Sequence, residues 1–388
     1  MRADGCHAFV YDVSSRDKEG IFGVNHVNKK NSPGKIGIIT FHWATNYGAV
    51  LQAYAMQQFL QKNGLDVSIV SYLPARVRLK DFLSNLLHGK WAVFAKERRL
   101  RPFRDRYLRL SRPVCRSSAA LRRRCGSAFD TVICGSDQIW NQSFIRGAEK
   151  SCTLSYFADF AGESTSRIAY APSFGTTRLD PAIQALIAPE LKKFTKLSVR
   201  ERSGRQILED MGLSAEVVLD PTLLLEACDY DTLLGEEQAG EKAGYFSYLL
   251  HSNQTAAKEL DMHLRQRFSG QKGGPDVQTM SLTQWLSSIR HARLVLTNSF
   301  HGMVFSILFH TDFLVVMVEG ADMNDRITTL LADLGLTDRI VAGCDPALAD
   351  ALAARSIDWE KVEQRRRARK KESVSFLASA LGVNLHED

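Results

Sequence analysis

Several common signatures are missing from this 388-residue sequence, and each absence excludes a class of protein. No run of about 18 apolar residues occurs, so we expect no transmembrane helix. The first 34 residues lack the continuous apolar segment of a signal peptide. No G-x-G-x-x-G or P-loop pattern follows a strand-like segment, which argues against a dinucleotide oxidoreductase or an NTPase. No G-x-S-x-G motif is present either, so acyl hydrolysis has no support.

Paired cysteines are also missing. The seven cysteines stand singly, at positions 6, 115, 125, 134, 152, 228 and 344, and none forms a C-x-x-C pair. An odd and unclustered set favours free thiols in a reducing cytoplasm over a zinc site or a disulfide framework. We therefore expect a cytoplasmic protein without a bound metal.

Charge is distributed unevenly along the chain. The formal net charge is +7, yet residues 96–124 hold 12 basic residues against two acidic ones, and residues 361–371 hold seven against one. Three interpretations of the 96–124 region stay open: a solvated helical face, a patch that faces anionic substrates or the inner face of the membrane, and a nucleic-acid surface. No motif for reading bases accompanies the arginines, so we expect no nucleic-acid partner.

The order of apolar segments predicts an α/β protein. Short apolar runs, typical of buried parallel strands, alternate with polar turns and with segments of helical periodicity. The length and the ordinary composition, 45% hydrophobic, favour two domains. We predict two Rossmann-type, doubly wound domains facing a central cleft, over residues 35–230 and 240–388, after a poorly structured extension over residues 1–34. Residues 228–244 are expected to be the linker, and a basic helix is expected to end the second domain.

Polar residues follow the predicted strands at their carboxyl ends, which is where ligands bind in such sheets. The stretches are ATNYGA from Ala44, GSDQIWN from Gly135, SVRERSG from Ser198, LDPT from Leu219 and TNSFHG from Thr297. Two facing domains would bring these strand ends together at one interdomain cleft.

The strand ends of the first domain supply candidate binding residues. A glycine at a helix N-terminus permits close backbone approach, although the alternative is a simple turn with Asn46 as the helix cap. Asp137 is a candidate base and Trp140 a candidate sugar-stacking residue. Alternatively, Ser136 or Asp137 caps a helix and Trp140 belongs to the core. The candidate acceptor-binding residues are Asn46, Tyr47, Gly48, Ser136, Gln138 and Trp140.

Arg200 and Asp220 lie at the ends of two later predicted strands, 197–200 and 216–219. The guanidinium fork of Arg200 suits a phosphate or a carboxylate, and the alternative is a surface ion pair with Glu201. Asp220 precedes a proline, so it either caps the following turn or takes part in catalysis.

His301 lies at a strand-to-helix turn of the second domain. Histidine titrates near neutral pH and can transfer a proton or hold a phosphate oxygen. A single histidine is more often structural, but Asn298, Ser299 and Gly302 surround this one at a predicted carboxyl edge. We predict that His301 is a functional residue.

Six stretches, in this order, resemble the polysaccharide pyruvyl transferase family: ITFHWATNYGAVLQAYAMQQFLQKNG, VICGSDQIWN, RIAYAPSFG, LSVRERSG, VVLDPTLLL and LTNSFHGMVFSILFH. The resemblance implies a GT-B-like pair of Rossmann-type domains, the first on the acceptor side and the second on the donor side. It implies transfer of pyruvate from phosphoenolpyruvate to a sugar as a cyclic ketal. It also implies that His301 and Arg200 serve phosphoenolpyruvate binding or catalysis.

The sequence departs from that family at one position. Some members have an arginine two residues before the histidine, where this chain has Ser299, so one expected phosphate ligand is missing. Arg293 and Arg326 are the candidates to replace it. The predicted donor-binding residues are Arg200, Asn298, Ser299, Gly302 and Arg326.

The implied reaction needs an anion site, a proton donor for the enol carbon and a base for the acceptor hydroxyl. We expect His301 to hold the phosphate or supply the proton, and Asp137 or Asp220 to orient or deprotonate the hydroxyl. Phosphoenolpyruvate is then a co-substrate, and no cofactor is expected. The expected acceptor is a sugar of a polysaccharide or a lipid-linked oligosaccharide, reached at the inner face of the membrane through residues 96–124.

Two other functions stay open on the sequence alone. A GT-B glycosyltransferase would bind a nucleotide sugar in the same cleft. A non-catalytic glycan-binding relative would lack a working donor site. Phosphoenolpyruvate binding and phosphate release separate these three functions.

Overall fold

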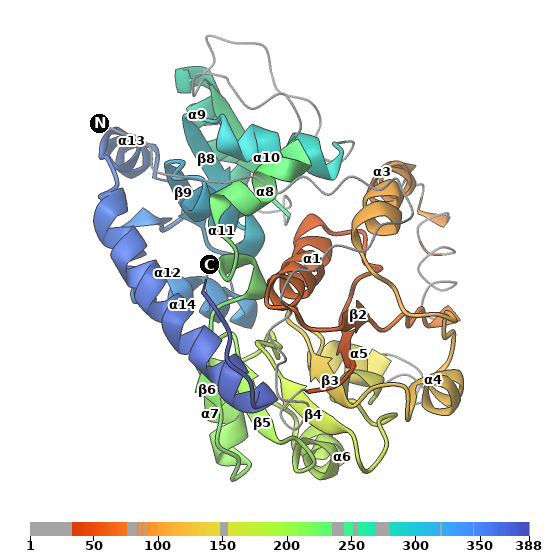
Figure 1. Ribbon diagram of the computed structural model, residues 1–388. Coiled ribbons are helices and arrows are strands. Elements are labelled where there is room, and N and C mark those ends of the chain that lie inside the picture. The colour runs from red at the N-terminus through yellow and green to blue at the C-terminus, as the bar shows by residue number, and fades with distance from the viewer. Residues whose placement is uncertain are drawn as a thin grey trace, which may run out of the picture.

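The computed structural model of the chain describes residues 33–75, 84, 87–88, 91–147, 154–234, 244–250, 255–268, 280–318, 320–343 and 345–387. It contains two parallel sheets, each surrounded by helices, that lie side by side (Figure 1). The predicted extension therefore lies almost wholly outside the described residues. So do Cys6, Cys152 and Cys344, whereas Cys115, Cys125, Cys134 and Cys228 carry free thiols.

The first sheet has six parallel strands in the order β2-β1-β3-β4-β5-β6. The strands are β1 (Ile36–Ile39), β2 (Val67–Ile69), β3 (Thr131–Cys134), β4 (Ser166–Ala169), β5 (Lys196–Val199) and β6 (Glu216–Val217). The chain moves to one side of β1 for β2 and to the other side for β3, so this sheet is doubly wound as predicted.

The helices of the first domain cover both faces of this sheet. They are α1 (Tyr47–Lys62), α3 (Trp91–Tyr107), α4 (Ser118–Cys125), α5 (Gln142–Gly147), α6 (Pro181–Leu191) and α7 (Arg202–Asp210). Ile36 and Ile38 of β1 pack in the same cluster as α1, whereas Ile39 packs in the cluster that contains residues of α4 and α6. The alternation of the strand therefore fills two cores, one on each face.

Helix α1 begins at Tyr47, directly after Asn46. The Asn46 side chain accepts hydrogen bonds from the backbone N–H groups of Gly48 (2.9 Å) and Ala49 (3.3 Å), so it caps the helix at its N-terminus. The basic region of residues 96–124 is helical in α3 and α4 and is interrupted between them. There the chain is extended and makes isolated parallel bridges, Ile69 with Leu110 and Tyr72 with Cys115.

The second sheet has four described strands in the order β10-β9-β8-β7, all parallel. The strands are β7 (Tyr245–Tyr248), β8 (Leu294–Thr297), β9 (Phe313–Val316) and β10 (Ile340–Val341). The helices are α9 (Thr255–Phe268), α10 (Leu282–Arg290), α11 (Phe300–Leu308), α12 (Asp325–Leu334), α13 (Pro346–Ala354) and α14 (Trp359–Leu381). The described strands follow one another in a single direction, so the reversal of a doubly wound sheet is absent among them.

The first part of the predicted linker is a helix, α8 (Ala227–Leu234). The prediction is wrong there because Tyr230, Leu233 and Leu234 recur at helical spacing and are buried in the core. Asp231 of α8 also forms an ion pair with Arg290 of α10, which ties the segment to the second domain. Residues 235–243 of the predicted linker lie outside the described residues.

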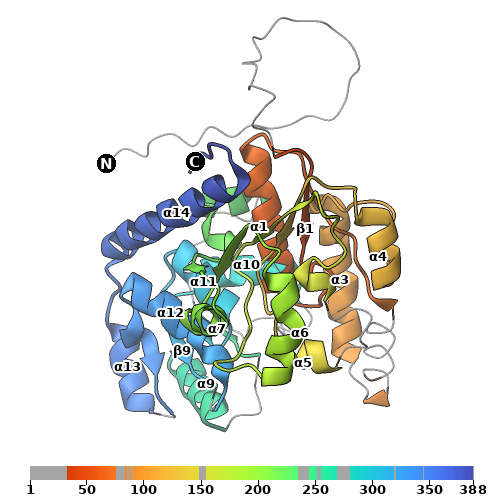
Figure 2. The ribbon, with the colours of Figure 1, turned by 90° about the horizontal axis from the view of Figure 1, so that it is seen from below.

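The C-terminal helix α14 belongs to both domains. It runs from α13 towards α1 along one side of the molecule (Figure 2). Its Ser373 accepts a hydrogen bond from the backbone N–H of Leu219 in the first domain (2.9 Å), and beyond its end His386 is hydrogen-bonded to Asn63. One hydrophobic cluster runs from β1 and α1 through α10 and α11 to α14. The two facing domains with this shared helix are the predicted GT-B-like arrangement.

None of the helices within the described residues is both long and apolar enough to cross a bilayer.

Candidate active site

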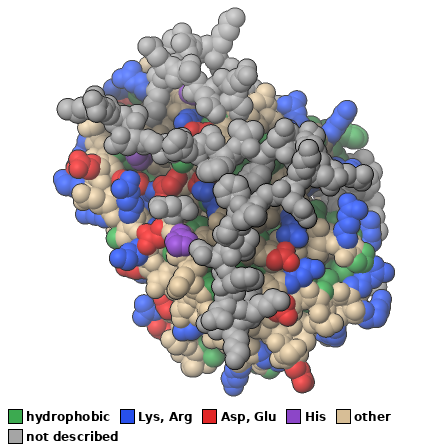
Figure 3. Space-filling model, in the orientation of Figure 1, with side chains coloured by type: hydrophobic (Ala, Val, Ile, Leu, Met, Phe, Trp, Pro, Cys, Tyr) green, Lys and Arg blue, Asp and Glu red, His purple; other side chains and the backbone are tan. Residues whose placement is uncertain are grey.

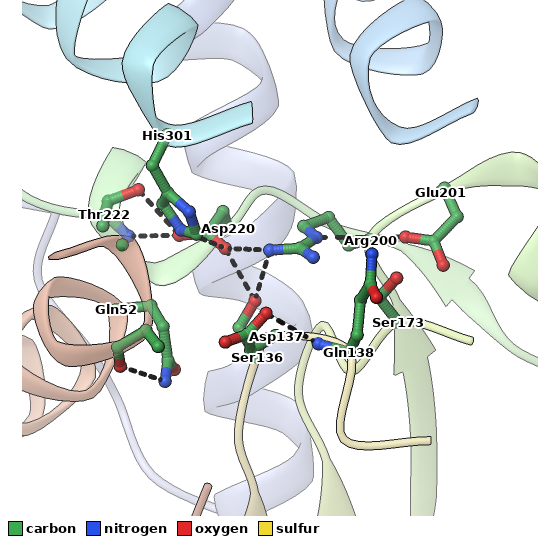
Figure 4. A network of polar contacts seen from close by, with 12 residues as sticks. Gln52, Ser136, Asp137, Gln138, Ser173, Arg200, Glu201, Asp220, Thr222 and His301 are labelled. Carbon is green, nitrogen blue, oxygen red and sulfur yellow. Dashed lines mark hydrogen bonds and ion pairs between the residues drawn. The ribbon is translucent and has the colours of Figure 1, made fainter. Parts of the chain in front are cut away.

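Residues that follow β3, β5, β6 and β8 meet between the two domains, around the carboxylate of Asp220 (Figure 4). Ser136 Oγ and Arg200 Nη1 both donate to Asp220 Oδ2, at 2.6 and 2.9 Å. The backbone N–H and the hydroxyl of Thr222 donate to the other oxygen, at 3.0 and 2.7 Å. Asp220 thus caps the short turn after it, as its structural interpretation predicted, and also links β3 to β5.

The environment of Asp220 holds its carboxyl in the charged form. Burial alone would raise its pKa, but the neighbouring His301 and Arg200, with the hydrogen bond from Ser136, lower that pKa well below the ordinary value. A carboxylate stabilised in this way is a poor base. Of the two roles predicted for Asp220, orientation therefore fits better than deprotonation.

His301 lies in the first turn of α11 and is almost fully buried, at 8% exposure. Its Nε2 is 3.6 Å from Asp220 Oδ2, and within the described residues it has no hydrogen-bond partner. The other side of the ring lies against the first turn of α1. A Cβ added to Gly48 would be 2.0 Å from His301 Nδ1, so only glycine leaves room for the imidazole. Each domain thus supplies part of the histidine site.

Two arginines converge on the ring of Phe300, the residue before His301. The guanidinium carbons of Arg200 and Arg326 lie 4.5 and 5.9 Å from the ring centre. Arg200 Nε and Nη2 and Arg326 Nε are buried and have no hydrogen-bond partner in the described part of the chain. Buried donors that lack acceptors are costly. Such a pair is therefore suited to an anion with several oxygens.

Arg200 and Arg326 also repel each other at this site. Burial and the nearby positive charge of Arg200 lower the pKa of Arg326 to about 10, against the opposing effect of Asp137, Glu201 and Asp220. A bound anion would relieve both the desolvation and the repulsion. The site is therefore electrostatically prepared for a negatively charged ligand.

Arg326 lies close to Phe300, the neighbour of Ser299, and so is near the position at which the expected arginine is absent. Ser299 itself caps α11, because its Oγ accepts a hydrogen bond from the N–H of Gly302 at 3.3 Å. Arg293, the other candidate, precedes β8 and so lies at the opposite edge of the sheet, with its guanidinium 5.8 Å from the ring centre of Phe268. Of the two candidates only Arg326 is placed to replace the arginine.

The remaining donor-side predictions, Asn298 and Gly302, shape the turn. Asn298 Oδ1 accepts a hydrogen bond from the N–H of Leu250 at 2.7 Å, while its Nδ2 is buried and has no hydrogen-bond partner among the described residues. A Cβ at Gly302 would lie 2.5 Å from Thr297 Oγ1, so this glycine permits close packing of α11 on β8.

Two predicted acceptor-binding residues belong instead to the core, and these predictions are wrong. Trp140 is fully buried, stacks on Phe157 with ring centres 5.1 Å apart, and donates to the backbone oxygen of Tyr156 at 2.9 Å. Tyr47 is also fully buried. Its hydroxyl donates to the backbone oxygen of Met280 in the second domain at 2.6 Å. The aromatic rings are used for packing, since neither is accessible to a sugar.

The other first-domain candidates have mixed roles. Asn46 is the cap of α1, and Ser136 is buried with its hydroxyl directed to Asp220, so neither presents its side chain to an acceptor as predicted. Asp137 has a left-handed backbone (φ 84°) and accepts a hydrogen bond from the N–H of Gln138 at 2.8 Å. Gln138 Oε1 accepts from Asn141 Nδ2 at 3.2 Å. Asp137 and Gln138 are partly exposed and stay acceptor-side candidates.

Sequence reasoning missed three residues of the site. The ring of Phe300 contacts both guanidinium groups, and the hydroxyl of Thr222 donates a hydrogen bond to Asp220. Glu201 was weighed only as a surface partner of Arg200, but it is 2% exposed, accepts from the N–H of Phe174 at 3.1 Å, and burial raises its pKa against the effect of Arg200. The signal for Phe300 was an aromatic residue inside an otherwise polar strand end.

One protein family matches most of the chain. A family model described as polysaccharide pyruvyl transferase matches residues 46–319. No curated protein matches the chain.

Three solved structures show distant likeness. A protein assigned as a UDP-N-acetylglucosamine 2-epimerase from Listeria monocytogenes is 8% identical, covering 91% of this chain and 98% of its own, with a TM-score of 0.49. The UDP-N-acetylglucosamine 2-epimerase from Rickettsia bellii is 10% identical, covering 89% and 96%, with a TM-score of 0.47. The spinosyn forosaminyltransferase SpnP is 12% identical, covering 87% and 95%, with a TM-score of 0.39. These likenesses are too distant to indicate a function.

Proposed function

The chain belongs to the polysaccharide pyruvyl transferase family, and we propose that it transfers pyruvate from phosphoenolpyruvate to a sugar of a polysaccharide or lipid-linked glycan precursor as a ketal. The assignment of the donor rests on two arginines beside His301, of which Arg200 is buried and Arg326 is partly buried. Arg200 and Arg326 have buried N–H groups without acceptors in the described residues. Phosphoenolpyruvate carries a phosphate and a carboxylate on one small carbon frame, so it can satisfy both guanidinium groups at once.

The reaction proceeds by addition to the enol double bond. A proton is added to C3 of phosphoenolpyruvate, and C2 becomes electrophilic. One acceptor hydroxyl attacks C2 and loses its proton, and the C2–O bond to phosphate breaks with its electron pair. A second hydroxyl then attacks C2, loses its proton and closes the ketal. One of the two hydroxyl protons balances the proton added to C3, and the other is taken up by the departing phosphate. The products are the ketal and inorganic phosphate. His301 carries the proton or holds the leaving phosphate, since its Nε2 has no hydrogen-bond partner in the described chain.

Asp220 positions the groups that act on the donor. It accepts from Arg200 and lies 3.6 Å from His301 Nε2, so one carboxylate fixes both the cation and the imidazole. Removal of one partner of a buried ion pair of this kind strongly destabilises the fold, because the other charge is left buried and unpaired. On the acceptor side, Asp137 is the candidate base, because it is a partly exposed carboxylate close enough to Arg326 to affect its pKa.

Phosphate release tests the proposal. The purified protein is incubated with phosphoenolpyruvate and a panel of glycan acceptors, and inorganic phosphate and ketal-bearing product are both measured. The proposal predicts acceptor-dependent phosphate release by the native chain and by His263→Ala, a variant of a histidine that pairs with Asp350 away from the site. It predicts no release by His301→Ala.

Two results would overturn this proposal. Turnover of a nucleotide sugar, with no phosphate release from phosphoenolpyruvate on any acceptor, would identify a glycosyltransferase. Glycan binding with no change in the melting temperature on adding phosphoenolpyruvate would identify a non-catalytic relative, since a ligand specific for the native state must raise stability.

A further inference from the structure

The outward face of α3 combines an exposed tryptophan with exposed arginines. Trp91, at the start of the helix, is 67% exposed, and Leu87, four residues earlier, is 81% exposed. Arg98, Arg99, Arg101 and Arg106 are also exposed. We call Trp91 and these four arginines the α3 face. In Figure 3, arginine or lysine and hydrophobic side chains lie next to one another at the upper right, where α3 lies in Figure 1.

The positive charge of the α3 face is largely uncompensated. Within the described residues, no acidic side chain pairs with Arg98 or Arg99. Arg101 is 3.6 Å from Asp105, but both side chains are exposed, so the pair contributes little. The other acid of the helix, Glu97, pairs with Arg104 instead. A solvated helical face would be expected to balance charges of both signs, whereas this side of α3 exposes four arginines and one acid, Asp105.

The inward face of α3 is fixed to the loop between β1 and α1. The Arg104 guanidinium donates to the backbone oxygens of Trp43 (3.0 Å) and Ala44 (3.4 Å), and Glu97 accepts from the hydroxyl of Thr45 (3.1 Å). Lys96 lies 4.0 Å from the ring centre of Tyr47. This loop leads directly into Gly48, the residue that leaves room for His301. The outward face is therefore rigidly connected to the active site.

We propose that the α3 face docks the protein on an anionic membrane surface, with Trp91 at the level of the lipid headgroups and the arginines on the anionic lipids. Tryptophan prefers the interface between water and lipid, and basic side chains near an anionic bilayer add to binding. A nucleic acid is the alternative partner, because tryptophan can stack on bases, but no motif for reading bases accompanies these arginines. Docking through α3 holds the interdomain site close to the bilayer. The consequence for the acceptor, that it is lipid-linked, rests on the proposed function.

Flotation with lipid vesicles tests the docking independently of the activity. Vesicles of phosphatidylcholine, with and without phosphatidylglycerol, are mixed with the native chain and two variants. The first variant is Arg98→Ser, Arg99→Ser, Arg101→Ser. The second is a charge-matched control, Arg355→Ser, Lys361→Ser, Arg367→Ser, whose side chains are 66%, 73% and 74% exposed on the second domain.

The native chain and the control should bind the vesicles that contain phosphatidylglycerol and not those without it. The α3 variant should bind the anionic vesicles about 100-fold more weakly. Trp91→Ala should weaken binding while keeping its dependence on salt, because it removes the apolar contact and not the charge. Circular dichroism and phosphate release with a water-soluble acceptor should be unchanged in the α3 variant.

Three outcomes would overturn the proposal. The native chain fails to bind anionic vesicles, the control loses as much binding as the α3 variant, or the α3 face binds DNA or RNA with steep salt dependence and vesicles not at all. None of them bears on phosphate release, so failure of docking is distinguishable from failure of the proposed activity.

Discussion

The turns after β1 and β8 have the same local pattern but different roles. Each strand ends, a polar side chain caps the next helix, an aromatic residue follows, and a glycine lies in the first turn. After β1 the cap is Asn46, and after β8 it is Ser299. Tyr47 then anchors the first domain on the second, whereas Phe300 carries two arginines. Similar local sequence therefore does not fix function, because function depends on what the opposite domain presents.

The two turns are complementary in shape. Gly48 in the first turn of α1 leaves an empty volume, and His301 in the first turn of α11 fills it. The two turns also hold the two most buried histidines near the site, His42 at 2% exposure and His301 at 8%. His42 has no acidic partner among the described residues, whereas His301 lies beside Asp220. We therefore propose a packing role for His42 and a chemical role for His301.

The largest effect is expected from His301→Ala. Loss of a proton-transferring group lowers turnover by about 100- to 10,000-fold, and removal of the neighbouring imidazole from Asp220 should disturb the donor site further. The fold should persist, because the substitution removes volume at the interdomain site and not in a strand. Steady-state phosphate release measures turnover, and circular dichroism checks folding. Near-native turnover in this variant would show that His301 packs like His42.

His42 should affect stability and not turnover. Burial lowers the pKa of His42 from 6.5 to about 4, so the folded protein keeps the ring neutral while the unfolded chain takes up a proton at 6.5. Its contribution to stability is therefore complete above pH 6.5 and falls by about 3 kcal/mol as the pH falls to about 4.

The measurement is urea unfolding between pH 7 and pH 4, with His42→Leu as the comparison. The native chain should lose more stability over this window than the variant. Equal losses in the two proteins would mean that His42 is not held neutral by burial.

Gly48→Ala should disturb the active site from the opposite domain. The new Cβ would overlap the ring of His301, so either the imidazole or the domain must move. A displacement of about 1 Å in a catalytic group can cost about 100-fold in rate. Gly64→Ala is a control for glycine replacement alone, because a Cβ at that position meets nothing within 4 Å, although its left-handed φ of +74° adds strain. Phosphate release by Gly48→Ala at the native rate would contradict the contact between the two turns.

The smallest effect is expected from a change in the ion pairs that connect the two domains. Asp333 of α12 pairs with Arg202 of the first domain and with Arg369 of α14, the latter at 3.2 Å. The Arg202 side chain is 57% exposed and that of Arg369 is 23% exposed, so Asp333→Asn should cost about 1 kcal/mol of stability and raise the KM for phosphoenolpyruvate about two- to threefold. Asp350→Asn, whose partners His263 and Arg267 lie within the second domain, should leave that KM unchanged.

The parallel strands and the strand ends could be predicted from the sequence, because a short apolar run that ends in polar residues is typical of a buried parallel strand. Arg200, Asp220 and His301 were all identified in this way, and they do meet. The roles of Trp140 and Tyr47 could not be predicted, since an aromatic residue beside a polar turn is equally suited to a sugar or to a core. Phe300 and Gly48 act across the domain interface, and local sequence carries no information on what lies opposite.

Arg200, Arg326 and His301 together are proposed to form one anion site for the donor. The most direct measurement is a crystal structure of the protein with phosphoenolpyruvate bound. We predict phosphate or carboxylate oxygens within hydrogen-bonding distance of both guanidinium groups and of His301 Nε2. Phosphoenolpyruvate bound elsewhere, with the buried nitrogens of Arg200 and Arg326 still lacking acceptors, would contradict the claim.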